Sequence, residues 1–91
     1  MGGFCPDDIA ITTRQVLHER WPILLVTHDA DDGAWQFVNG HGDTDDTDSA
    51  LVVGIESVSA LDPTILELSD LPMGWSAWRA SVDGDWRREP R

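Results

Sequence analysis

The chain has 91 residues, a length typical of one domain built around one hydrophobic core. Its apolar content of 41%, with five tryptophans, argues against disorder. No lysine is present, and the formal net charge of −11 argues against binding to nucleic acid or to anionic lipid. We therefore expect a single domain over residues 1–91, with an ordered core from about 11 to 89, that binds neither nucleic acid nor membranes.

The cysteine content and the apolar runs indicate the cellular compartment. Cys5 is the only cysteine, so the chain cannot form an internal disulfide, and zinc sites that need two or four cysteines lack their ligands. An apolar run such as Ile23–Val26 is far shorter than the roughly 20 residues of a membrane-spanning helix. The amino terminus lacks the basic and apolar segments of a signal peptide. These features predict a cytoplasmic protein in which Cys5 is dispensable.

The first predicted element is a short amphipathic helix over residues 12–20. Thr12 or Thr13 can accept hydrogen bonds from the free amide groups at its start, and the apolar side chains that follow recur at helical spacing. Pro22 ends the helix, because proline has no amide hydrogen and its ring clashes with the preceding turn.

A β-hairpin is predicted next. Residues 23–27 form a nearly continuous apolar run with β-branched members, which is typical of a central strand. Residues 29–33 supply turn chemistry, and residues 34–38 return with Trp35 and Phe37 alternating with smaller or polar side chains.

The middle of the chain predicts a loop, a strand and a helical region. Residues 40–49 contain no large apolar side chain and are expected to be loop, whereas residues 50–55 are expected to form a strand. Helical structure is expected at 57–70, with Asp62 as an N-cap inside this region and Pro63 at a first helical position, where its missing amide hydrogen costs nothing.

The last residues predict a second hairpin and complete the fold class. Residues 75–82 and 86–88 are expected to be strands joined by a turn at Asp83-Gly84. We predict an α+β fold: a small antiparallel sheet of four to five strands, with the helices near 12–20 and 57–70 packed on one face. The predicted core comprises Ile23, Leu25, Phe37, Val52, Ile55, Leu61, Ile65, Leu68 and Trp78.

Two acidic segments flank the second strand of the first hairpin, HDADDG at 28–33 and GHGDTDDTDS at 40–49. They can be an ion site, a surface that meets a basic partner, or a solvated connection. A calcium loop of the EF-hand type needs glycine at its sixth position and a carboxylate at its twelfth. Counted from Asp43, these positions are Asp48 and Gly54, so the pattern fails. The sequence predicts no metal site and leaves the other two interpretations open.

The sequence also contains no catalytic constellation. No serine lies in a Gly-x-Ser-x-Gly turn, no glycine-rich phosphate loop is present, and His28 and His41 are not expected to converge. A carboxylate such as Asp62 or Glu56 beside Trp75 would have a raised pKa, but a helix cap explains Asp62 better. We therefore expect no enzymatic activity, no cofactor and no bound metal.

Trp75, Trp78 and Trp86 are concentrated near the carboxyl terminus, and three such rings cannot all be interior in a domain of this size. They either cover the small core or include an anchor for a partner, because tryptophan is common among interface hot spots. The candidate partner-binding residues are Asp31, Asp32, Asp43, Asp45, Asp46, Asp48 and Trp75.

Several motifs follow one another between Val16 and Trp86: DDGAWQF, a valine-rich strand, LDPTILEL, LPMG and an arginine five residues beyond the glycine. In this order they resemble the immunity-protein-like family of small bacterial domains, catalogued in part as a domain of unknown function. The matching positions are Trp35, Phe37, Asp62, Pro63, Pro72, Gly74 and Arg79. The chain departs from the pattern at Val38 and Asn39, where members often carry leucine and cysteine.

The resemblance implies a small α+β fold and the neutralisation of a toxin in bacterial competition. Together with the charge, it leads us to expect a non-catalytic acidic interaction domain whose partner is a basic protein, for example a toxin that acts on nucleic acid. The alternatives are a housekeeping or regulatory domain without a toxin partner, or a divalent-metal-binding protein. Arg79 is expected to pair with Asp62 or Glu56 and so tie the last hairpin to the helical region.

Overall fold

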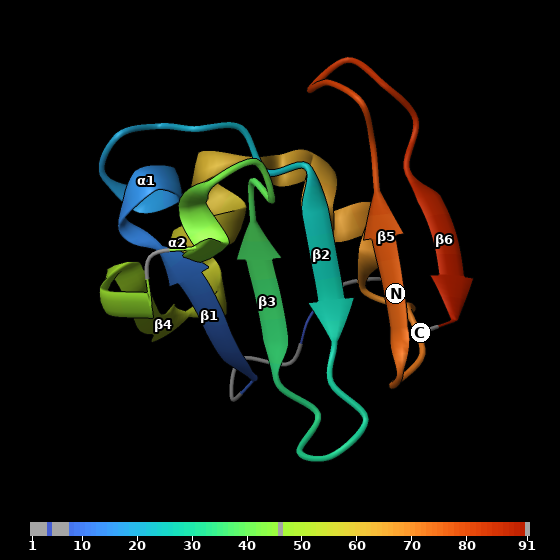
Figure 1. Cartoon of the computed structure of the whole chain (residues 1–91). Coiled ribbons are helices and arrows are strands. Elements are labelled where there is room, and N and C mark those ends of the chain that lie inside the picture. The colour runs from blue at the N-terminus through green and yellow to red at the C-terminus, as the bar shows by residue number, and fades with distance from the viewer. Residues whose placement is uncertain (1–3, 5–7, 46, 91) are drawn as a thin grey trace.

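The computed structural model describes residues 4, 8–45 and 47–90 (Figure 1). Its strands are β1 (Ile9–Thr13), β2 (Leu25–His28), β3 (Trp35–Val38), β4 (Ala50–Gly54), β5 (Trp75–Trp78) and β6 (Arg87–Pro90). Its helices are α1 (Arg14–Leu17) and α2 (Ile55–Leu61), with 3-10 segments η1 (Asp43–Asp45), η2 (Thr47–Ser49) and η3 (Pro63–Leu68). The six strands form one sheet in the order β4-β1-β3-β2-β5-β6. Cys5 and Asp46, which carried predictions, lie outside the described residues.

The α+β class is confirmed, but the predicted sheet of four to five antiparallel strands is wrong in two respects. The sheet has six strands, and it is mixed, because β1 runs parallel to β3 while the other neighbours are antiparallel. The additional strand is β1, whose sequence IAITT is largely β-branched and fits a pleated strand better than a helix. Helix α1 is therefore only one turn long, and it starts where Thr13 Oγ1 accepts a hydrogen bond from Val16 N at 3.3 Å, as the cap prediction required.

Both predicted hairpins are present. β2 pairs antiparallel with β3, and β5 pairs antiparallel with β6. In the first turn, Asp29 N donates to Ala34 O at 2.8 Å, and Gly33 adopts a φ of 73°, which glycine tolerates best. The second hairpin is joined by residues 79–86 rather than by the two-residue turn that the sequence predicted.

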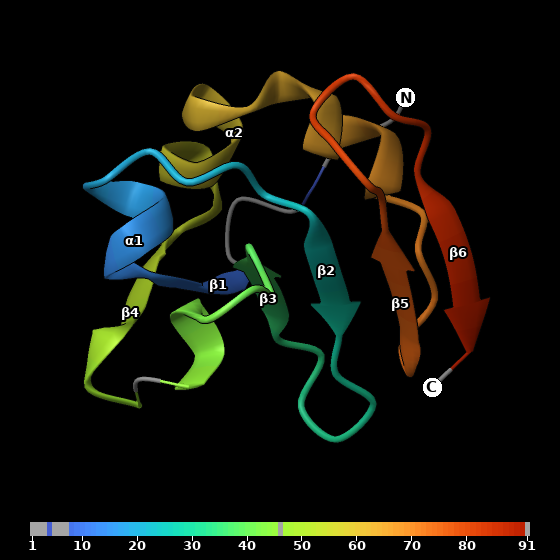
Figure 2. The ribbon, with the colours of Figure 1, turned by 45° about the horizontal axis from the view of Figure 1, so that its top comes forward.

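The helical region at 57–70 divides into two segments on one side of the sheet (Figures 1 and 2). Helix α2 ends at Leu61, and η3 begins at Pro63 with Asp62 as its N-cap, since Asp62 Oδ1 accepts from Thr64 N at 3.0 Å. The cap and the position of Pro63 are as predicted, although the second segment is a 3-10 helix. β6 is tied to η3 by Arg88, which donates to Glu67 O at 2.7 Å. Arg88 also donates to Asp70, just beyond η3, at 2.7 Å and lowers the pKa of that carboxyl through this hydrogen bond and its charge.

The hydrophobic core lies between the sheet and these helical segments. One row of side chains crosses the sheet toward the core, in the paired order Leu51, Thr12, Phe37, Val26 and Ala77. All but Leu51 are fully buried, and Phe4 adds an edge-to-face contact with Trp35 at a ring distance of 4.7 Å. The buried residues from the helical segments are Ile55, Val58, Ile65 and Leu68.

Most of the predicted core is confirmed, but three positions are wrong. Ile23, Phe37, Ile55, Ile65 and Leu68 are buried, and the partly buried Leu61 packs against them. Leu25 is partly buried but pairs with Trp78, so it points to the face away from the core and its prediction as a core residue is wrong. Val52 is 74% exposed and Trp78 is 40% exposed. Successive side chains of a strand point to opposite faces, so an assignment that is off by one residue exchanges the faces. In β4 and β5 the core-facing residues are the neighbours of Val52 and Trp78.

None of the described helices has both the length and the apolar content that a membrane crossing requires.

Candidate functional site

The two acidic segments lie at opposite ends of β3 (Figure 1). Residues 29–34 connect β2 to β3, whereas residues 39–49 leave the other end of β3 and lead into β4. Since β3 has four residues, its ends are separated by roughly 13 Å at about 3.3 Å per residue. The structure therefore presents two acidic groups at the two ends of a strand.

Asp43 is buried and holds the second acidic segment together. Its Oδ2 atom accepts hydrogen bonds from Thr13 Oγ1 and Asn39 N, and its Oδ1 atom accepts one from Gly40 N, all at 2.8 Å. Its main-chain carbonyl accepts from Ser49 Oγ at 3.1 Å. The sequence placed Asp43 among the partner-binding candidates, but its carboxylate is enclosed within the segment and is not part of the exposed acidic surface.

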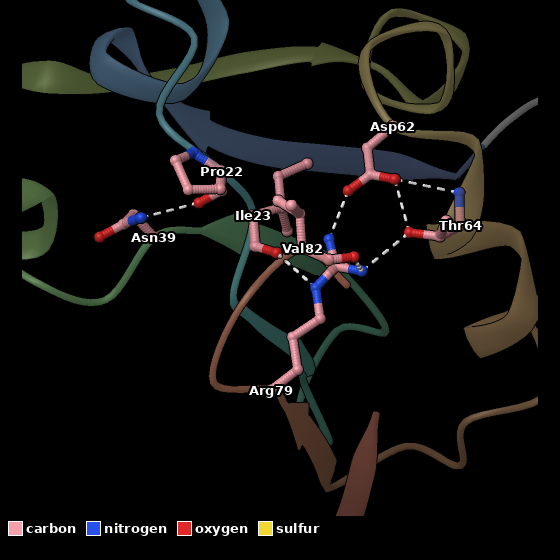
Figure 3. A network of polar contacts seen from close by, with 7 residues as sticks. All are labelled: Pro22, Ile23, Asn39, Asp62, Thr64, Arg79 and Val82. Atoms are coloured by element: carbon pink, nitrogen blue, oxygen red, sulfur yellow. Dashed lines mark hydrogen bonds and ion pairs between the residues drawn. The ribbon is translucent and has the colours of Figure 1, made fainter. Parts of the chain in front are cut away.

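Asn39 connects the same segment to the chain between α1 and β2. Its side-chain nitrogen donates to Pro22 O at 2.8 Å (Figure 3), and its side-chain oxygen accepts from His41 N at 3.2 Å. Both ends of the Asn39 amide are therefore hydrogen-bonded to main-chain groups.

The remaining described aspartates of the candidate set are exposed. Asp31 and Asp32 lie in the β2–β3 turn, and Asp32 Oδ1 also accepts from Ala34 N at 2.9 Å. Asp45 and Asp48 lie in η1 and η2, just before β4. These four carboxylates are the described members of the predicted partner surface that solvent reaches.

Trp75 and Trp78 occupy opposite faces of β5. Trp75 is half-buried and packs against the core, whereas Trp78 is exposed on the other face of the sheet. The guanidinium of Arg87 lies 5.6 Å from the centre of the Trp78 ring. The sequence selected Trp75 as the anchor, and the signal that identifies Trp78 is the alternation of faces in the sheet, which becomes available only once the register is known.

Arg79 is a buried cation that joins three parts of the chain (Figure 3). Its Nε donates to Ile23 O at 3.1 Å, and its terminal nitrogens donate to Thr64 Oγ1 at 3.0 Å, to Val82 O at 3.2 Å and to Asp62 Oδ2 at 2.5 Å. The predicted pairing with Asp62 is therefore confirmed. These contacts fasten the β5–β6 connection to the start of η3, so the role of Arg79 is structural.

Trp86 covers the Arg79 network, since the guanidinium lies 4.2 Å from the centre of the indole ring. Beside the network is a half-open cavity of about 610 Å³ with apolar walls that include Trp21, Leu61 and Val82. Arg20 and Asp83 also line it, and Arg20 has a φ of 63°, which is uncommon for a residue other than glycine. Because charges of both signs line the cavity, it favours neither an anionic nor a cationic ligand.

Potential metal ligands do not gather in the part of the chain that the structure describes. No three histidine, cysteine, aspartate or glutamate side chains of the described residues gather as a metal ion would require. His28 Nδ1 donates to Leu71 O at 2.7 Å, and its ring stacks on Trp35 at 3.8 Å, so His28 is a packing residue. His41 is exposed at the other end of β3.

Comparisons with known proteins found no family model, no curated protein and no solved structure that matches this chain.

Proposed function

We propose that this chain is a small, non-catalytic interaction domain that binds a basic protein, in the manner of the immunity proteins that its motifs resemble. The observation that carries the proposal is the placement of its charges. Asp31, Asp32, Asp45 and Asp48 are exposed on the connections at both ends of β3. A partner that approaches either end of β3 therefore meets exposed negative charge.

The arginines offset only part of the negative charge of the molecule. Arg79 is buried on Asp62, Arg88 pairs with Asp70, Arg14 lies 3.9 Å from Glu19, and Arg87 lies over an indole ring. The chain has only six arginines and no lysine to set against its seventeen carboxylates. Arg79 is buried, and the exposed Arg14 and Arg88 each lie beside a carboxylate, while the aspartates of the connections face solvent. Such a field accelerates encounters with a basic surface and slows them with an acidic one.

The proposal is tested by affinity capture from the source cells. The wild-type domain and a variant with Asp31, Asp32, Asp45 and Asp48 changed to asparagine are immobilised, and bound proteins are eluted with increasing salt and identified by mass spectrometry. Asp43 is left unchanged because its carboxylate holds the fold. We expect a protein of high isoelectric point on the wild-type domain that is lost from the variant. Proteins that bind both forms equally would contradict the proposal.

A second arm tests the resemblance to immunity proteins. The captured protein is expressed in cells alone and together with the wild-type domain. If it is a toxin, it should arrest growth when expressed alone, and the wild-type domain should restore growth. A captured basic protein that is harmless would leave an acidic interaction domain without an immunity role.

A further inference from the structure

The two edge strands of the sheet differ in how they are protected. β6 consists of Arg87–Pro90, so charged residues and a proline occupy this edge. β4 has the sequence ALVVG, with neither charge nor proline. Edge strands present unpaired main-chain N–H and C=O groups, and charges and prolines are common means of preventing another chain from pairing with them. β4 has neither of these protections.

The outer side of β4 is open within the described part of the chain. β1 pairs with one side of β4 over all five residues of the strand, and no described strand pairs with the other side. Hydrogen bonds alternate along an antiparallel pair, so alternate residues of β4 direct their N–H and C=O groups away from β1. A further strand that pairs with these groups would extend the sheet by one strand.

The side chains of β4 indicate what such a strand would contact. Val52 is exposed on the face of the sheet opposite the core, next to the partly buried Ile11 on β1. Leu51 and Val53 point to the opposite face and are partly buried. An added strand with small or β-branched residues at alternate positions would place one of them beside Val52, where cross-strand pairs of this kind are favourable.

Carboxylates lie at both ends of β4 and decide which kind of chain fits. Asp45 and Asp48 precede the strand and Glu56 follows it, and all three side chains are exposed. A second copy of this protein would bring another net charge of −11, with its own carboxylates near those of the first. A segment with basic residues at its ends would instead meet opposite charge at both ends of the strand.

We infer that the outer edge of β4 binds an extended segment of the basic partner by strand addition. In this mode the main-chain hydrogen bonds supply much of the affinity and the side chains supply selectivity. The segment would have about five residues of alternating small or β-branched character, flanked by lysine or arginine. The basic character of the segment rests on the proposed function. The docking mode rests on the position of β4 at the edge of the sheet and on its lack of charged residues and proline.

Three synthetic peptides separate these two parts of the inference. The first alternates threonine and valine between pairs of lysines. The second has the same strand with glutamates in place of the lysines. The third keeps the lysines but has prolines in place of both the threonines and the valines, so that no N–H group of its strand segment remains to pair. Each peptide is titrated into the full chain labelled with ¹⁵N, and amide shifts and hydrogen exchange are recorded.

The first peptide should shift the amides of β4 and protect alternate ones from exchange, and the other two should not. If the proline peptide binds as well as the first, the docking mode is overturned and a charge-driven function survives. If the glutamate peptide protects β4 equally, the edge is correct and the proposed basic partner is not. Shifts at β6, no protection of β4 at millimolar peptide, or protection of β4 by self-association without peptide would each overturn the inference.

A pair of matched variants tests the location with the same probe. Val52→Lys places a like charge beside the added strand and should weaken binding of the first peptide by about tenfold. Val82→Lys makes the same change at another exposed valine, in the β5–β6 connection, and should leave binding unchanged. Both side chains are exposed, so neither variant should lose the fold. Equal weakening by the two variants would show that the effect is general charge and not the edge of β4.

Discussion

At the scale of single residues, Asp43 differs from its acidic neighbours because its charge is enclosed by donors. Both of its oxygens accept from main-chain N–H groups, Asn39 N on one and Gly40 N on the other. An asparagine at this position presents one NH₂ group, so one of these buried N–H groups would lose its acceptor. We expect Asp43→Asn to destabilise the fold by about 1–3 kcal/mol, which corresponds to a melting temperature lower by at least about 4 °C.

The matched control for this change is Asp45→Asn, which alters an exposed carboxylate in the same 3-10 segment. Its melting temperature should stay close to that of the wild type, since exposed substitutions usually change stability by less than about 0.5 kcal/mol. Thermal unfolding followed by circular dichroism checks both variants. An Asp43→Asn protein as stable as Asp45→Asn would show that the carboxylate of Asp43 does not organise the segment.

Arg79 is a second charged residue that is buried and stabilises the fold through its hydrogen bonds. Its removal would leave Asp62 without its cation and two carbonyl groups without a donor. Because the side chain of Asp62 is 19% exposed, water can compensate in part, and we expect Arg79→Ala to cost about 3 kcal/mol in urea unfolding. Arg87→Ala removes an exposed arginine from the neighbouring strand and should cost under about 1 kcal/mol. Similar losses in the two variants would contradict the structural role of Arg79.

At the scale of elements, local signals predicted more of the fold than long-range pairing did. Both hairpins, the Thr13 and Asp62 caps and the acidic connections follow from residue types a few positions apart. β1 was missed because its β-branched residues run directly into the helix cap at Thr13, and the neighbours that pair with it, β3 and β4, lie far along the chain. A short amphipathic sequence can form a helix or a strand, and tertiary pairing decides between them.

The faces of β4 give a test at this scale, because adjacent valines lie on opposite sides. Val53 pairs with the fully buried Ala10 and packs against the core, whereas Val52 is exposed. Valine and threonine have nearly the same shape, so Val→Thr adds a hydroxyl with little change in volume. We expect Val53→Thr to cost about 1 kcal/mol and Val52→Thr to be nearly neutral in urea unfolding. The reverse order of stabilities would show that the register of β4 is shifted by one residue.

At the scale of the whole molecule, the distribution of charge is the property from which function follows. The sequence predicted an acidic surface but not its arrangement. It did not separate Asp43, whose carboxylate is enclosed, from the exposed aspartates, because that distinction depends on donors from β1 and from the end of β3. Nor did it identify Trp78 or the edge of β4, because exposure there depends on strand order.

The same distribution leads to a prediction about metal ions. The exposed aspartates among the described residues do not converge and so attract divalent cations weakly, and the enclosed oxygens of Asp43 already accept three hydrogen bonds. Calorimetry with calcium, manganese and zinc should therefore give dissociation constants of about 1 mM or larger, or no measurable heat. A stoichiometric site with a sub-micromolar constant would reassign the protein as a metal-binding domain.

The most direct test of an acidic domain that attracts a basic partner is the association rate as a function of salt. It is measured for the wild type and for the variant with Asp31, Asp32, Asp45 and Asp48 changed to asparagine, with the captured partner or, if none is captured, the lysine-flanked strand peptide. Steering by several charges predicts a rate for the variant that is lower by about tenfold or more at low salt. The two rates should converge as the Debye length falls to about 3 Å near 1 M salt. Equal association rates at low salt would contradict the account and would leave these aspartates as the solvated surface of two connections.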